Sequence, residues 1–514
     1  MTAATVAAGA LDGADAPRPV WRERMAPLIG GGGWAATLGI TLLAGLLRFL
    51  RLDIPRGKIF DEIYYSCDAQ NLLRFGVEQG SKPGPKCIPN GQPGFIVHPP
   101  LGKWLIGLGE KTFGVNEFGW RFSAAVAGTL SVLILIRLAR RMTGSTLLGC
   151  LAGLLMTFDG LHFVQSRASM LDIFLMLFVL GAVTCAVIDR DQVRARLAAM
   201  DDDILAGWGP SLGRRPWLIG AGVCLGAALA TKWSGLYYLA LLLPLVIWFE
   251  AGARRTAGIV APWRATVRRS LPRLLALFVV LPVALYVLSW AGWFHASNGW
   301  DRHWATKDNA TYGFLPDVLR SWWHYHVEIY GFHSNLASKH LYQSHPLGWL
   351  LLARPVSYYY PAGITAGQYG CQVASCSREV LAIGTPALWW ASIPMLVGAV
   401  AFWVSRRDWR GLVVVLLVAA SIVPWIPSDL HRRTMFLFYA LPAVPFMCLG
   451  LALMAGWALG PATASARRRA TAATAIGVYV ALVVLNFVYL YPVLAAQTLP
   501  YTDWHQRMWF ASWI

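Results

Sequence analysis

Long apolar runs separated by short polar connections occupy most of the 514-residue chain. A helix needs about 20 mostly apolar residues to cross a bilayer. By this measure the pattern predicts spanning helices at 34–50, 122–139, 145–161, 169–188, 217–231, 235–250, 273–292, 384–404, 411–427, 434–459 and 475–495. The runs are continuous rather than alternating, which favours helices over the strands of a closed barrel. We therefore expect an all-α polytopic membrane protein with about 11 transmembrane helices.

Arginine clusters fall in alternate connections between the predicted spans. Basic loops stay on the cytoplasmic side, so the N-terminus is predicted inside and the protein multi-pass in the plasma membrane. The first span lacks a small-residue cleavage site and is expected to be a retained anchor. Two long loops, which are usually functional, then lie outside. The predicted parts are a flexible cytoplasmic N-terminus (1–33), a transmembrane domain (34–495) with outer loops 51–121 and 293–383, and an extracytoplasmic C-terminal tail (496–514).

Composition agrees with this topology and argues against other classes of protein. Hydrophobic residues make up 56% of the chain and charged residues 14%, whereas soluble domains carry about 25% charged residues. The net charge of +18 would suit nucleic acid, but the arginines lie between apolar runs, as in cytoplasmic loops. We therefore expect no nucleic-acid partner. The high aromatic content excludes a disordered chain.

Four of the eight cysteines fall inside predicted spans, where a thiol behaves as a small apolar group. The other four, Cys67, Cys87, Cys371 and Cys376, all fall in the two outer loops. An oxidising exterior would allow Cys67–Cys87 and Cys371–Cys376 disulfides. Four cysteines permit three pairings, so the pairing is a hypothesis at this point.

Two adjacent carboxylates, Asp61 and Glu62, follow the first predicted span. Neighbouring residues on a helix point in different directions, so the two carboxylates would not share one proton. This predicts a division of labour in which one carboxylate takes a proton and the other holds a substrate group. The alternative is a solvated helix N-terminus stabilised by the helix dipole.

Basic residues recur at the outer ends of the predicted spans and in the first outer loop. They are Arg48, His98, Lys103, Arg121, Arg167, Lys232 and Arg433. Each one alone could snorkel to lipid headgroups. Together, beside a carboxylate, they suit a lipid-linked phosphate as leaving group, held by cations while the carboxylate deprotonates an incoming hydroxyl. No nucleotide-binding glycine loop follows a strand, so a nucleotide donor is unsupported.

Several motifs resemble, in order along the chain, those of the protein O-mannosyltransferases, specifically their bacterial, actinobacterial-type members. They are Phe60-Asp-Glu62, His98-Pro-Pro-Leu-Gly-Lys103, Arg121, Asp159-Gly-Leu-His162 with Gln165-Ser-Arg167, Thr231-Lys-Trp-Ser-Gly235, Arg354-Pro-Val-Ser-Tyr-Tyr-Tyr360 and Arg432-Arg-Thr-Met-Phe-Leu-Phe-Tyr439. The resemblance implies a glycosyltransferase of the multispanning GT-C fold. Such an enzyme transfers mannose from a polyprenyl phosphate to Ser or Thr of exported proteins at the outer membrane face, with inversion.

The resemblance also implies roles for individual residues. Asp61 would be the general base, and Glu62 would help to position acceptor or sugar. The donor phosphate would be bound by Arg48, Arg121, Lys232, His98, Lys103 and Arg433, and the substrate would be positioned by Tyr64, Tyr65, Asp159, His162 and Arg167. No cofactor is implied besides the lipid-linked donor. The expected partners are this donor, exported Ser/Thr-containing proteins and membrane lipid, and docking on the secretion machinery is left open.

The second outer loop is too short for the β-trefoil domain that eukaryotic family members insert there. It holds seven of the 11 histidines, at 295, 303, 324, 326, 333, 340 and 345. No spacing matches a tight zinc-ligand set, so we expect no metal site. Aromatic-rich amphipathic helices on the outer leaflet are the better interpretation of this loop.

Two alternative functions also fit a polytopic membrane protein. The first is a GT-C enzyme that delivers aminoarabinose or arabinose to lipid or polysaccharide, and the reaction product would distinguish it. The second is a secondary transporter, which is expected to show internal repeats and charges near the bilayer midplane. The chain shows no convincing repeat, and most of its charges lie near the ends of the spans.

Overall fold

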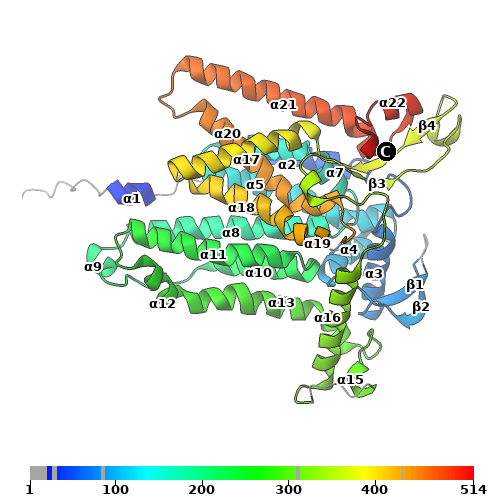
Figure 1. Ribbon diagram of the computed structural model, residues 1–514, viewed down its shortest axis with the longest axis horizontal. Helices are drawn as coiled ribbons and strands as arrows, with labels where there is room; N and C mark the ends of the chain where they lie inside the picture. The colour runs from blue at the N-terminus through cyan, green and yellow to red at the C-terminus, as the bar shows by residue number, and fades with distance from the viewer. Residues whose placement is uncertain (1–19, 26–31, 83–86, 308–312, 431) are drawn as a thin grey trace, which may run out of the picture.

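The computed structural model describes residues 20–25, 32–82, 87–307, 313–430 and 432–514, and it is mainly a bundle of roughly parallel and antiparallel helices (Figure 1). Eight of its helical segments are long and apolar enough to cross a membrane. They are α5 (Glu117–Thr143), α8 (Asp172–Ala198), α11 (Gly235–Thr256), α12 with α13 (Pro262–Ser289), α17 (Pro386–Arg406), α18 with α19 (Trp409–Asp429), α20 with its preceding 3-10 turn (Leu437–Leu459) and α21 (Ala466–Leu494).

Three shorter apolar helices lie in the remaining predicted spans: α2 (Trp34–Phe49), α6 (Thr146–Thr157) and α10 (Pro216–Thr231). Each of the predicted spans coincides with one helical segment, so the membrane-protein class is confirmed. Three predicted spans are clearly too short. The α8 helix ends at Ala198 rather than 188, and the α12–α13 segment begins at Pro262 rather than 273. The last helix begins at Ala466 rather than 475, because the Ser465 side chain accepts a hydrogen bond from the Arg468 amide and caps it.

The two long loops lie at one end of the bundle, here called the outer-loop end, on the right in Figure 1. The first loop holds α3 (Glu62–Phe75) and α4 (Leu101–Phe113), and the second holds the 19-residue α16 (Asp317–Asn335). Short helices complete this end: α7 (Gly160–Gln165), α14 (Ala291–His295), α15 (Trp304–Lys307) and α22 (Tyr501–His505). At the opposite end lie α1 (Val20–Met25) and α9 (Asp202–Leu205). The predicted flexible segment 1–33 otherwise falls mostly outside the described residues.

Six short strands at the outer-loop end were not predicted. They form three antiparallel pairs: β1 (Gln79–Lys82) with β2 (Ile88–Pro93), β3 (Val356–Tyr359) with β5 (Val380–Ala382), and β4 (Cys376–Arg378) with β6 (Thr498–Pro500). Strands of three to six residues are too short to show a clear alternation of apolar and polar positions. They add local order to loops without changing the mainly helical class.

The C-terminal segment is a folded part of this end rather than a simple tail. Thr498 pairs with Arg378 in the β4–β6 register, and the Trp513 indole donates to the Leu352 carbonyl at 2.8 Å. The Trp504 indole donates to the Glu379 carboxylate at 2.6 Å. Residues 496–514 therefore pack against the second loop.

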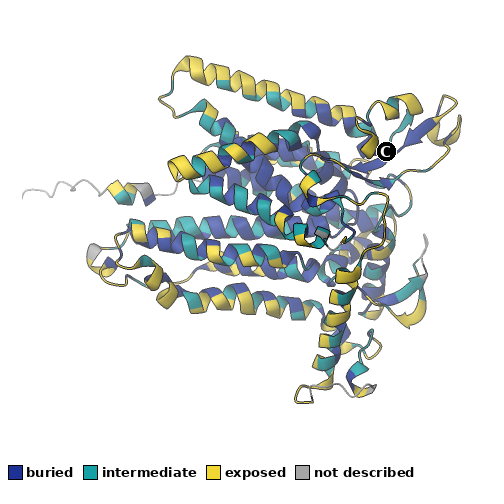
Figure 2. Cartoon of the chain, viewed as in Figure 1, coloured by how far each residue is buried: buried dark blue, intermediate teal, exposed yellow. Residues whose placement is uncertain are grey.

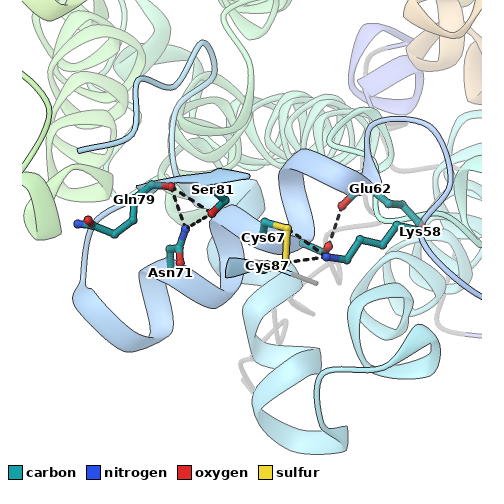
Figure 3. Close-up of a disulfide and its surroundings, with 8 residues drawn as sticks. Lys58, Glu62, Cys67, Asn71, Gln79, Ser81 and Cys87 are labelled. Atoms are coloured by element: carbon teal, nitrogen blue, oxygen red, sulfur yellow. Dashed lines mark hydrogen bonds between the residues drawn. A yellow bond between two sulfur atoms is a disulfide. The ribbon is translucent and has the colours of Figure 1, made fainter. Parts of the chain in front are cut away.

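Both predicted disulfides are present. Cys67 in α3 is bonded to Cys87, and Cys371 is bonded to Cys376. Figure 3 shows the first disulfide beside Lys58 and beside Asn71, whose amide donates to the Gln79 carbonyl at 3.0 Å. The disulfide and this hydrogen bond tie α3 to the β1–β2 hairpin.

The helices differ in how far they are buried. In α20 and its preceding turn, 83% of the apolar stretch is buried inside the protein, whereas in α12–α13 and in α21 only 22% of it is buried (Figure 2). The central helices approach closely at small residues. A Cβ at Gly128 in α5 would lie 2.0 Å from the Ser166 hydroxyl, so only glycine permits this contact with the segment after α7.

A buried ion-pair network joins the helices at the opposite end. Arg215 donates to both oxygens of Asp189, at 3.0 and 2.5 Å, and to Glu250 at 2.5 Å. Arg254 pairs with the second oxygen of Glu250 at 3.0 Å. The four side chains come from α8, α11 and the residue before α10, so the network fixes these helices to one another.

Replacing Arg215 by Leu should destabilise the bundle, because Asp189 loses its partner while it stays buried. We expect the free energy of unfolding to fall by about 3–5 kcal/mol, measured by thermal unfolding of the purified protein in detergent. Arg214→Leu is the matched control, since the Arg214 side chain is exposed. Equal unfolding temperatures for the two variants would contradict this role.

Candidate active site

Asp61 stands directly before α3, at the end of a connection from α2 that is held by aromatic side chains. The preceding residue, Phe60, has a positive φ of 46°. Its ring stacks on Tyr358 at 4.6 Å and meets the edges of Phe436 and Phe438 at 5.9 and 5.8 Å. The motifs around Tyr358 and Phe436, far apart in the sequence, therefore converge on the residue beside Asp61 and fix its backbone.

Glu62 is fully buried, and both of its carboxylate oxygens accept hydrogen bonds from the protein. The donors are Ile59 N (3.0 Å), Trp120 Nε1 (3.3 Å), Arg121 Nε (2.8 Å), Arg121 Nη2 (2.9 Å) and Ser169 N (3.0 Å). A carboxylate offers about four lone-pair sites, so this one is saturated. The prediction that Glu62 holds a substrate group is corrected: it is a positioning residue that joins α3 to α5 and to the segment before α8.

Arg121 is the partner of Glu62, and its exposed fraction is 0%. Its guanidinium also donates to the carbonyls of Leu52, Pro55 and Gly57, at 3.2, 2.9 and 2.9 Å. The charge is neutralised and the donors are used within the protein. The prediction that Arg121 binds a donor phosphate is therefore corrected, since the residue instead organises the loop that leads to Asp61.

The Asp61 carboxyl is half-buried, and its surroundings alter its acidity. Burial raises its pKa to about 6, the nearby Asp172 adds to the rise, and Lys232 opposes it. Tyr65, one turn along α3, forms a hydrogen bond with the same carboxyl. Lys232 is itself paired with Asp172, at 2.8 and 3.1 Å. A carboxylate with a pKa near neutrality is suited to accept a proton from a weakly acidic hydroxyl.

A cavity of about 900 Å³ is lined by Lys232, the cation that acts on this carboxyl. Its other polar lining residues include His98, His333 and Arg433, together with aromatic side chains such as Tyr439. The His98 ring lies 6.2 Å from the ring of Tyr65, the partner of Asp61. Of the predicted phosphate-binding residues, the structure therefore brings together His98, Lys232 and Arg433 at this cavity.

Arg433 lacks a carboxylate partner within 4 Å among the residues that the structure describes. Its Nε donates to the His333 carbonyl at 2.9 Å, and its Nη2 lies 3.3 Å from His333 Nδ1. His333 Nε2 lies 2.7 Å from the Val97 carbonyl, which can only accept, so Nδ1 is free to accept from Arg433. Burial lowers the pKa of His333 to about 4 and that of His98 well below its usual value. Both rings are neutral, and Arg433 keeps an uncompensated charge.

The other predicted cations lie outside this cavity. Arg48 is fully buried, where it contacts His162 Nδ1 at 2.6 Å and donates to the Ala44 carbonyl at 3.0 Å. Lys103 pairs with Asp68 at 2.9 Å and with Glu78 at 3.4 Å. The predictions that Arg48 and Lys103 bind a phosphate are corrected, because burial and internal partners occupy both side chains.

Three of the predicted substrate-positioning residues also serve the fold. His162 Nε2 lies 2.9 Å from the Ser131 hydroxyl, and Asp159 accepts from the Trp389 indole at 2.7 Å. Arg167 donates to the carbonyls of Arg48, Leu50 and Arg51, at 2.9, 2.7 and 2.8 Å, and so caps the end of α2. These contacts give Asp159, His162 and Arg167 structural roles, and their predicted contact with substrate stays a prediction.

The two predicted tyrosines differ. Tyr65 is buried beside Asp61, whereas the Tyr64 side chain is 58% exposed on the outside of α3, so its predicted positioning role has no structural support. Sequence reasoning assigned no role to Phe60, Asp172, His333 or Tyr358. Phe60 and Tyr358 lie inside the recognised motifs, and this position in the sequence could have indicated a role for them. Among the described residues, no group of three or more His, Cys, Asp or Glu is placed to hold a metal ion.

Replacing Arg121 by Met should destabilise the outer-loop end, because Glu62 would remain buried without its charged partner. We expect a loss of about 3–5 kcal/mol in the free energy of unfolding, measured as for Arg215. The double variant Glu62→Gln/Arg121→Met should recover part of this loss, since it removes both charges. Arg56→Ala, whose side chain is 70% exposed, is the control. If Arg121→Met unfolds at the wild-type temperature, the positioning role is wrong.

Comparison with known proteins identifies the family. The family model "dolichyl-phosphate-mannose-protein mannosyltransferase" matches residues 39–297, and "C-terminal four TMM region of protein-O-mannosyltransferase" matches residues 318–513. A polyprenol-phosphate-mannose–protein mannosyltransferase of Mycolicibacterium smegmatis (strain MKD8) is 41% identical over 500 residues, covering 95% of this chain and 94% of the relative. A protein of the same name from Mycobacterium tuberculosis (strain CDC 1551 / Oshkosh) is 40% identical, covering 94% and 92%.

Solved structures share the fold at low sequence identity. The S. cerevisiae protein O-mannosyltransferase Pmt1–Pmt2 complex bound to the sugar donor matches with a TM-score of 0.72 at 14% identity, covering 96% of this chain and 94% of that chain. ArnT from Cupriavidus metallidurans in the apo state matches with a TM-score of 0.52 at 16% identity, covering 90% and 76%. The predicted GT-C fold is confirmed. The chain is a glycosyltransferase that belongs to the dolichyl-phosphate-mannose-protein mannosyltransferase family.

Proposed function

We propose that this chain transfers mannose from polyprenyl-phosphate-mannose to Ser or Thr hydroxyls of exported proteins, with Asp61 as general base. The observation that carries the proposal is that Lys232, whose charge acts on Asp61, lines a cavity together with Arg433. A carboxylate next to cations suits a reaction that takes a proton from an alcohol and releases a phosphate. Family membership and the relatives' names support mannose as the sugar.

The reaction is a single displacement. The acceptor hydroxyl gives its proton to Asp61 while its oxygen forms a bond to the anomeric carbon. The bond from that carbon to the phosphate oxygen breaks, and its electron pair leaves with the polyprenyl phosphate. Attack from the face opposite the leaving group inverts the anomeric carbon. The proton, the carbon–oxygen bonds and the electron pair therefore balance among Asp61, the acceptor and the donor.

Arg433 is the residue best suited to bind the phosphate. Its charge has no carboxylate partner among the described residues, and the neutral His333 holds its guanidinium from one side. Lys232 contributes less net charge because it is paired with Asp172, but it borders both the cavity and Asp61. The negative charge that develops on the leaving phosphate oxygen would therefore be stabilised by two cations, Lys232 and Arg433, and the charge of Arg433 is not neutralised by a carboxylate.

We also propose that the outer-loop end faces the exterior of the plasma membrane. Both disulfides lie at this end, and disulfides form in oxidising compartments. Arginine-rich connections gather at the opposite end, as the positive-inside rule requires for a cytoplasmic face. Exported proteins would meet Asp61 on this side.

Asp61→Asn should abolish transfer, since an amide cannot take the acceptor proton. We expect the rate to fall by at least about 100-fold in an assay with radiolabelled polyprenyl-phosphate-mannose and a Thr/Pro-rich peptide. Asp53→Asn, in the same connection and half exposed, is the matched control and should keep the wild-type rate. Near-normal turnover of Asp61→Asn would remove the general-base assignment. Wild-type protein that labels no peptide would instead contradict the protein acceptor.

The rate should also depend on pH through Asp61. Because burial raises its pKa to about 6, the carboxyl is protonated and inactive below that pH and becomes an active base above it. We expect kcat/KM, which reports the free enzyme, to rise between about pH 5 and pH 7 with a midpoint near 6. Burial raises the pKa of Glu379 to about 7, so Glu379→Gln is the control and should keep the midpoint. A rate that is flat over this range would contradict the prediction.

A further inference from the structure

A second cavity, of about 950 Å³, opens at the end of the bundle opposite Asp61. It lies among the last turns of α17 and α20, the start of α18, the first turn of α21 and the connection between α5 and α6. In Figure 1 these ends of α17, α20 and α21 lie on the left, far from α3. The proposed reaction uses none of these residues.

Charge in this cavity is strongly one-sided. Four arginines line it, against a single acidic residue, Asp408. Asp408 is paired with Arg410, which donates to its two carboxylate oxygens at 2.9 and 2.6 Å. Among the described residues, the remaining three have no carboxylate within 4 Å. They are Arg406, Arg468 and Arg469.

Two of these guanidinium groups are held in place by neutral acceptors. Arg468 donates to the Trp457 and Ala458 carbonyls at 2.8 and 3.1 Å, and Arg469 donates to the Ala462 carbonyl at 3.2 Å. These hydrogen bonds orient the side chains at the cavity without cancelling their charge. Three positive charges therefore remain available for an anion.

The cavity also has an apolar wall. Phe402 and Trp457 stack at 3.6 Å with their planes 14° apart, and Leu147, Leu148 and Leu453 line the cavity with them. Leu147 is 67% exposed, and only 28% and 22% of the apolar stretches of α17 and α21 are buried inside the protein. The apolar wall thus continues onto helix surfaces that face the lipid. Its ligand must combine an anionic group with an apolar body.

We propose that this cavity binds the headgroup of an anionic phospholipid from the inner leaflet. Its phosphate would pair with Arg406, Arg468 and Arg469, since arginine forks match phosphate oxygens, and its acyl chain would lie along Leu147 and Phe402. Basic pockets between helices on the cytoplasmic side are suited to such lipids. The positive-inside rule accounts for arginines in the loops, but not for their convergence on a cavity with an apolar wall. The leaflet rests on the orientation proposed above.

The bound lipid would join two parts of the chain. The residues that precede α6 belong to the first family region, and the α17, α20 and α21 residues belong to the C-terminal four-helix region. One direct hydrogen bond already crosses this boundary at the cavity, from Arg410 Nη1 to the Met142 carbonyl at 3.1 Å. A lipid held by both sides would strengthen the same contact.

Native mass spectrometry of the full chain in detergent tests the proposal, with phosphatidylglycerol and phosphatidylcholine of identical acyl chains as probes. We expect one retained phosphatidylglycerol and about tenfold weaker binding to Arg406→Gln/Arg469→Gln. Arg264→Gln/Arg269→Gln, which removes two exposed charges at the same end but outside the cavity, is the matched control and should bind as wild type. Ala462→Trp should also lose the lipid, because it fills the cavity and keeps every charge.

Equal retention of the two lipids, or equal loss in both double variants, would overturn the proposal. Inorganic phosphate that displaces the lipid at equal concentration would also overturn it, because the apolar wall would then contribute nothing. Asp61→Asn should retain phosphatidylglycerol while it loses mannose transfer. This variant separates a failure of the lipid site from a failure of the proposed reaction.

Discussion

The buried pair between Glu62 and Arg121 is the interaction on which the active end of this protein depends. Neither side chain is exposed, and together they fix the start of α3, the first turns of α5 and the loop between α2 and α3. A buried charge without its partner is strongly destabilising, so each of the two residues depends on the other. Asp61 is the neighbour of Glu62 in the chain, and its position follows from this pair. The conspicuous acidic pair therefore divides into one residue that holds the backbone and one that faces the chemistry.

The same principle explains the other charges within the bundle. Arg48 contacts His162, Lys232 pairs with Asp172, and Arg215 joins Asp189 to Glu250. Ionisable groups at membrane depth are costly unless they are paired, and most of these side chains have found partners on neighbouring helices. Their role is to specify which helices meet. A count of cations at the ends of the spans therefore overestimates how many of them are available to a ligand.

The fold could be predicted from the sequence more fully than the site. Apolar runs identified every helix that is long and apolar enough to cross a membrane, because the bilayer demands continuous hydrophobic length, although α12 and α21 begin 11 and nine residues earlier than their predicted spans. The acidic pair and the two disulfides were also identified. The partners of the arginines were not, since Glu62 and Arg121 lie 59 residues apart and Arg48 and His162 lie 114 apart. Sequence gives the charge of a side chain and its approximate depth, but the distant residue that neutralises it is known only once the helices are packed.

Charge compensation then separates structural cations from those that can receive an anion. At the outer-loop end, Arg433 lines a cavity, and its side-chain partners among the described residues are neutral: the carbonyl and ring nitrogen of His333 and the Trp425 ring. At the opposite end, Arg468 and Arg469 are held by carbonyls beside a second cavity. In both places neutral acceptors orient a guanidinium without cancelling its charge, which prepares the site for a phosphate at little cost in reorganisation. A guanidinium held by neutral groups would thus bind the phosphate of the donor at one end and that of a membrane phospholipid at the other. The two sites differ in that a carboxylate able to take a proton accompanies only the site where bonds are broken.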